Sequence, residues 1–131
     1  MQIDWEEFDE GAARKKGECV HVTLSRKRTF FLNQKAIEAL GDPDAVVLLY
    51  DRRRSIVGMR RSSVDAPNAF RLKRKEQKRN FPGRVVYAAN FCRRYGIDPS
   101  ETLAFTDAHV DKDGVLVLSL HEVKPFPQRR A

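Results

Sequence analysis

The sequence has few cysteines and no long apolar run. Its 131 residues include only two cysteines, too few for the disulfide framework of a small secreted domain. Neither Cys19 nor Cys92 belongs to a paired metal-ligand spacing, so we expect both to be reduced core residues. No stretch approaches the roughly 20 apolar residues of a membrane-spanning helix, and the acidic N-terminus is unlike a secretory signal. These absences predict a cytoplasmic protein without a membrane partner.

Catalytic and cofactor-binding motifs are also absent from the sequence. There is no glycine-rich phosphate loop and no Gly-x-Ser-x-Gly elbow, and His21, His109 and His121 are isolated in predicted strands. Residues 107–114 superficially resemble a calcium loop, but its first ligand would be His109 and its closing glutamate position is Leu120. We expect the acids there to be turn residues. The sequence therefore predicts no enzyme, no bound metal and no cofactor.

Charge is distributed unevenly along the chain. The net charge is +7, yet residues 1–18 hold six acids and three bases. Residues 19–131 therefore hold 22 bases and 12 acids, a net charge of +10. This favours a polyanionic partner, and nucleic acid before an anionic membrane, because no long amphipathic helix is predicted. The alternative is a charge balance that serves solubility. The acidic tail is expected to compete with an anionic ligand for the basic domain.

One pattern of predicted elements occurs twice. In the first copy, strands at 20–25 and 29–32 precede a short helix that begins after Asn33 and ends at Gly41, and strands at 46–50 and 55–59 follow. In the second copy, a strand at 69–73 and a return strand from near residue 83 precede a helix that ends at Gly96. Strands at 102–106 and 115–118 follow. The two glycines are 55 residues apart, a spacing typical of a duplicated unit whose open apolar face is closed by its twin.

The duplication predicts a mainly β protein with short helices, an α+β fold in which two ββαββ repeats form one pseudo-two-fold barrel. At 131 residues the chain is long enough for a single modest core. The expected organisation is an acidic tail at 1–18, the first repeat at 19–61, a linker at 62–68, the second repeat at 69–122 and a C-terminal tail at 123–131.

Lysines and arginines concentrate at the two predicted hairpin tips and on the second helix. Equivalent loops of a pseudo-two-fold barrel fall on one face, so we expect the tips to form one nucleic-acid-binding patch. The candidate residues are Arg26, Lys27 and Arg28 in the first tip, Lys73, Arg74, Lys75, Lys78 and Arg79 in the second, Arg84 on the return strand, and Arg93 and Arg94 on the helix. The alternative is a solvated helix face and a hairpin that lysines keep from aggregating. A further basic run, residues 52–54, is expected to be a solvated turn on the opposite side.

The order of these elements resembles the AbrB/SpoVT/MazE type of DNA-binding fold. The match is best at residues 83–86, Gly-Arg-Val-Val, and at residues 92–97, Cys-Arg-Arg-Tyr-Gly-Ile. Two units in one chain resemble the tandem arrangement of MraZ and of cradle-loop barrels. The resemblance implies a swapped-hairpin barrel and transcription regulation, with DNA contacts from Arg84, Arg93, Arg94 and Arg28. The first helix departs from the family, because it has Ile37-Glu38 where family members have basic residues.

The expected function is therefore duplex DNA binding by a transcriptional regulator. An RNA-binding barrel is one alternative. A protein-interaction module of the antitoxin kind is another, with a partner bound through the tail around Trp5 and Phe8 or the tail around Phe126. The chain is expected to be a monomeric pseudo-dimer or, if hairpins are exchanged between molecules, a homodimer.

Overall fold

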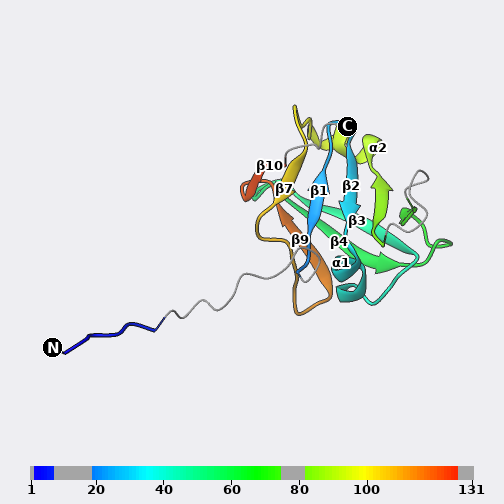
Figure 1. Ribbon diagram of the computed structural model, residues 1–131. Coiled ribbons are helices and arrows are strands. Elements are labelled where there is room, and N and C mark those ends of the chain that lie inside the picture. Colours follow the sequence, from blue (N-terminus) through cyan, green and yellow to red (C-terminus); the bar gives the residue numbers. More distant parts are fainter. Residues whose placement is uncertain (1, 8–18, 75–81, 127–131) are drawn as a thin grey trace.

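A computed structural model describes residues 2–7, 19–74 and 82–126 and consists mainly of β-strands (Figure 1). The strands of the first half are β1 (Val22–Leu24), β2 (Thr29–Leu32), β3 (Ala45–Asp51) and β4 (Ile56–Ser62). Those of the second half are β5 (Ala69–Arg71), β6 (Arg84–Tyr87), β7 (Leu103–Phe105), β8 (His109–Val110), β9 (Val115–Ser119) and β10 (Val123–Pro125). The helices are α1 (Gln34–Ala39) and α2 (Ala89–Tyr95). Within the described residues, no helix has the length and apolar character needed to cross a membrane.

The strands form two five-stranded antiparallel sheets that pack face to face (Figure 1). The first sheet has the order β10-β7-β1-β2-β6, and the second has the order β5-β3-β4-β9-β8. Each sheet therefore combines strands from both halves of the chain. The mainly β prediction with short helices is confirmed. Among the described strands, however, neither sheet closes on itself into a barrel.

The core lies between the two sheets and follows the alternation of the strands. On β2, Phe30 and Leu32 are buried while Thr29 and Phe31 are only partly covered, and on β9 Leu116 and Leu118 are buried in the same way. Each fully buried side chain of this size stabilises the fold by roughly 1.5–3 kcal/mol. Hydrophobic burial therefore fixes which face of each sheet is turned to solvent.

Local signals set the helix boundaries. The Asn33 side chain accepts a hydrogen bond from the Ala36 amide at 3.0 Å, as predicted for an N-cap. Gly41 follows α1 with a φ of +88°, and Gly96 closes α2 with a φ of +67°. Glycine adopts this left-handed region without the steric cost that a Cβ atom brings. The predicted start of α1 and the predicted ends of both helices are confirmed.

Three predictions about burial and strand pairing differ from the structure. Cys92 is buried, but Cys19 is exposed because β1 begins only at Val22. The apolar run at residues 46–50 has no polar alternation and so predicts a strand through the core, yet after Val46 the side chains of β3 are only partly buried. Residues 123–125, assigned to the tail, form β10 and pair with β7 at the edge of the first sheet. An edge position tolerates Pro125 because it needs no amide donor on its open side.

Candidate nucleic-acid interface

Strand β6 lies between the two basic hairpin tips. On one side β6 pairs with β2, and Tyr87 lies opposite Thr29, directly after the turn that carries Arg26 and Lys27. On the other side Lys73 and Val85 exchange two backbone hydrogen bonds, of 2.9 and 2.7 Å. The four-residue strand β6 therefore lies between β2, which leads out of the first basic tip, and Lys73, which begins the second.

An exposed aromatic ring lies in the middle of this arrangement. Tyr87 is 54% exposed, and the Lys73 ammonium lies 5.6 Å from the centre of its ring. Such a ring offers a stacking face to a base or sugar, and the cations beside it attract the phosphate backbone. Tyr87 was not among the residues predicted from the sequence. The available signal was an aromatic residue at the end of the strand that returns from the second basic tip.

The β1–β2 turn has a defined conformation. The Arg28 amide donates to the Ser25 carbonyl at 2.9 Å, and the Ser25 amide donates to the Thr29 carbonyl at 3.0 Å. Arg28 itself has a φ of +59°, in the left-handed region where a side chain is strained. That conformation costs a non-glycine residue roughly 1–2 kcal/mol. The structure therefore holds an arginine at a position where glycine fits more easily.

Arg28 joins the β1–β2 turn to both ends of α2. Its carbonyl accepts a hydrogen bond from the Ala88 amide, at the start of the helix, at 3.0 Å. Its guanidinium forms a 2.9 Å ion pair with Asp98, which follows the helix. The Nε atom of Arg28 is buried and has no hydrogen-bond partner among the described residues. Arg28 therefore serves to position α2, and its charge is partly neutralised by Asp98.

The outward face of α2 carries the two predicted helix arginines. Arg93 and Arg94 are exposed in the last turn, whereas Phe91 and Cys92 point into the core. Cations at this end of a helix interact favourably with the partial negative charge of its free carbonyls. The Cys92 thiol is shielded from water, and this burial raises its pKa to about 11 although the Arg28 charge opposes the shift. A thiol with this pKa is a structural residue, as predicted.

The basic run at residues 52–54 lies beside α2, in contrast to the predicted position on the opposite side. The Arg52 guanidinium is 5.0 Å from the centre of the Tyr95 ring, and Arg94 approaches the same ring at 5.8 Å. Arg54 pairs with Asp51 at 3.0 Å, and this hydrogen bond lowers the Asp51 pKa. The difference arises from tertiary packing of Tyr50 and Tyr95, whose ring centres are 4.7 Å apart.

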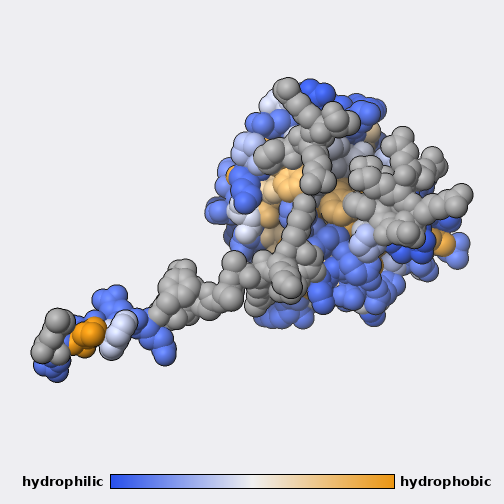
Figure 2. Space-filling view, viewed as in Figure 1, coloured by the Kyte–Doolittle hydropathy of each residue, from blue (hydrophilic) through white to orange (hydrophobic). Residues whose placement is uncertain are grey.

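The remaining candidate cations occupy different environments. Arg84 is half-buried at the start of β6, and its guanidinium donates to the Gly83 carbonyl at 2.9 Å. Arg26, Lys27, Lys73 and Arg74 are exposed. Three further candidates lie outside the described residues: Lys75, Lys78 and Arg79. Figure 2 shows that polar side chains cover most of the visible surface around a central apolar area.

The two predicted partner-binding tails differ. In the N-terminal segment 2–7, which has no helix or strand, Trp5 is 83% exposed; Phe8 lies outside the described residues. At the other end, the Phe126 ring lies 5.3 Å from the His21 ring, and its amide donates to the Thr102 carbonyl. Phe126 is therefore anchored to the folded body.

The acids near the β8–β9 turn have a structural role. The Asp111 side chain accepts hydrogen bonds from the Asp113 and Val115 amides at 2.9 and 3.0 Å, which confirms the prediction of turn residues. Residues 2–7, 19–74 and 82–126 contain no group of three or more His, Cys, Asp or Glu side chains placed to hold a metal ion.

Comparison with known proteins adds no assignment. No protein-family model, no curated protein and no solved structure matches this chain.

Proposed function

We propose that the protein is a DNA-binding transcriptional regulator. The basic surface of this proposal consists of Arg26, Lys27, Lys73, Arg74, Tyr87, Arg93 and Arg94. The observation that carries it is the position of β6, which pairs on one side with the strand that leads out of the first basic tip and on the other with Lys73 of the second, and which ends in an exposed tyrosine. Cations clustered on one face supply the counterion-release term that dominates affinity for nucleic acids.

Different residues of the basic surface have different roles. The exposed lysines and arginines beside β6 contact phosphates, which fixes the position of the duplex without reading sequence. Arg93 and Arg94 are attached to a helix that the core and the Arg28–Asp98 ion pair hold in place. A guanidinium positioned in this way pairs with the O6 and N7 atoms of guanine in the major groove.

We further propose that the two halves are related by a pseudo-two-fold axis, as in swapped-hairpin barrels. The strand pairing supports this relation, because β1 of the first half pairs with β7 of the second, and β5 of the second pairs with β3 of the first. The pairs β2–β6 and β4–β9 join counterparts in the two halves. This pairing within one chain favours a monomeric pseudo-dimer over a hairpin-exchanged homodimer, and light scattering distinguishes the two masses.

Electrophoretic mobility and fluorescence anisotropy with duplex DNA test the proposed function. Affinity is expected to fall by about 10³-fold or more between about 50 and 200 mM salt if six or more phosphates are contacted. RNA of the same sequence serves as the competitor, and tighter binding of RNA would favour the RNA-binding alternative. Absence of any complex at low salt would contradict both forms of nucleic-acid binding.

A protein-interaction module is the second candidate function. The exposed Trp5 and Ile3, between acidic neighbours, form a short segment of the kind that orders when it binds a partner. A stable complex with another protein that is lost when residues 1–18 are removed, together with no affinity for DNA, would favour this candidate.

A further inference from the structure

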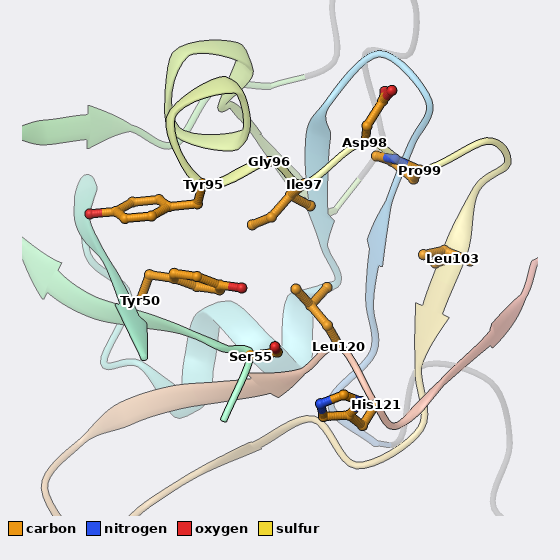
Figure 3. Close-up of a pocket in the computed structure, with 10 residues that line it drawn as sticks. All are labelled: Tyr50, Ser55, Tyr95, Gly96, Ile97, Asp98, Pro99, Leu103, Leu120 and His121. Carbon is orange, nitrogen blue, oxygen red and sulfur yellow. The ribbon is translucent and has the colours of Figure 1, made fainter. Parts of the chain in front are cut away.

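A pocket of about 340 Å³ opens beside the C-terminal end of α2 (Figure 3). Three connections meet there. The loop after α2 contributes Ile97, the turn between β3 and β4 contributes Ser55, and the turn between β9 and β10 contributes Leu120 and His121. A hydrogen bond of 3.0 Å from the Leu120 amide to the Ser55 carbonyl fixes two of these connections to each other.

The lining of the pocket has polar and apolar surface in similar amounts. Ile97, Leu103 and Leu120 supply aliphatic surface, and Figure 3 shows the Tyr50 hydroxyl directed toward Ile97 and Leu120. The Tyr50 ring is held by Tyr95 at 4.7 Å between ring centres and by Phe91 at 6.1 Å in an edge-on contact. The volume is near the lower end of ligand pockets, about 300–1,000 Å³. Such a site suits one planar ring system with hydrogen-bonding groups at its edge.

The pocket is continuous with the basic surface. Asp98, at its rim, is the residue that pairs with Arg28 of the β1–β2 turn at 2.9 Å. Tyr95 forms part of the opposite wall, and its ring is approached by Arg52 and Arg94 at 5.0 and 5.8 Å. Two cations, Arg52 and Arg94, therefore lie on one side of an opening with mixed polar and apolar walls, and the Arg28–Asp98 ion pair lies on the other. A base attached to a sugar and phosphate combines a ring for the apolar part with a negative charge for the cations.

We infer that this pocket receives an unpaired nucleobase, an inference that rests on the proposed function. A base inside a duplex must first be unstacked, whereas a base in a single-stranded extension or bulge is already free. The protein then prefers a duplex that carries such a base next to the basic surface. The same chemistry is offered by a free nucleoside monophosphate, so both sources belong in the test.

The test measures anisotropy with labelled blunt duplex DNA and with the same duplex carrying a short single-stranded extension. The extension is expected to tighten binding about tenfold, the effect of one stacked base. Leu120→Trp fills the pocket and is expected to remove this preference while leaving affinity for blunt duplex unchanged. Tyr50→Phe keeps the ring and removes only the hydroxyl, so it provides a second variant, and it is expected to reduce the preference. The preference for the extension is also measured for His121→Ala, which changes a residue of the pocket. The matched control is His109→Ala, which changes an exposed histidine on β8 that does not line the pocket.

The outcomes separate the inference from the proposed function. If blunt duplex binds with steep salt dependence but the extension adds nothing, or if folded Leu120→Trp keeps the full preference, the pocket inference is overturned and the proposed function stands. If no DNA binds but adenosine or guanosine monophosphate does, and Leu120→Trp abolishes that binding, the proposed function is overturned and the pocket is a site for a free nucleotide.

Discussion

Neutralising the cations beside β6 is expected to weaken DNA binding and flatten its salt dependence. Two double variants address the two sides of the strand separately, Arg26→Gln with Lys27→Gln and Lys73→Gln with Arg74→Gln. Each phosphate contact contributes about 0.9 to the slope of log affinity against log salt concentration. Each double variant therefore lowers the slope by up to about 1.8, and their combination by up to about 3.6.

The size of this effect makes it measurable by anisotropy across a salt titration. All four side chains are exposed, so the glutamine replacements leave the core intact. Loss of the Lys73 contact with the Tyr87 ring costs only about 0.5–1 kcal/mol at an exposed site. We therefore expect the glutamine variants to lose affinity for DNA while their melting temperatures stay close to that of the parent protein.

The control removes two charges elsewhere. Arg60 on β4 and Lys112 in the β8–β9 turn are both exposed on the second sheet, away from β6. The double variant Arg60→Gln with Lys112→Gln is expected to leave the slope nearly unchanged. If it flattens the slope as much as the β6 variants do, binding depends only on net charge and the argument for a defined surface is refuted.

Four further predictions concern other residues. Arg93→Ala should reduce discrimination between sequences by about 1–3 kcal/mol in competition assays, with little change in non-specific binding. Gly83→Ala should lower the free energy of unfolding by about 1–3 kcal/mol or more, because its Cβ would lie 2.6 Å from the Leu32 carbonyl oxygen; chemical denaturation measures this change. At pH 8 a maleimide should label the exposed Cys19 and spare Cys92, whose pKa is about 11; equal rates would contradict its burial. Deleting residues 1–18 should tighten DNA binding at low salt by removing a competing acidic segment, and unchanged affinity would eliminate that role.

The elements that sequence analysis predicted correctly depend on local interactions. Asn33 caps α1 through its own side chain, and Gly96 ends α2 because the left-handed conformation favours glycine. The Asp111–Gly114 turn is likewise set by hydrogen bonds within five residues. Signals of this kind are contained in a short window of sequence, so they can be recognised without knowledge of the tertiary structure.

The elements that were missed or misplaced depend on distant partners. Strand β10 exists because β7 offers an edge to residues 123–125, and nothing in that proline-containing segment indicates it. The turn at 52–54 lies beside α2 because aromatic rings from two halves of the chain pack together. Tyr87 gains its position between the tips only when β6 inserts beside β2. The candidate cations could be predicted from the sequence, but their neighbours could not.

The location of β6 has a consequence for how the proposed binding face forms during folding. Since the strand borders residues from both halves, a ribosome must complete β6 in the second half before the proposed binding face can form, and the first half alone does not present it. Long-range pairing of this kind slows folding, because distant segments must meet first. A ligand that contacts both borders of the strand binds only the folded chain. Adding the ligand should therefore raise the melting temperature in proportion to the logarithm of the ligand concentration.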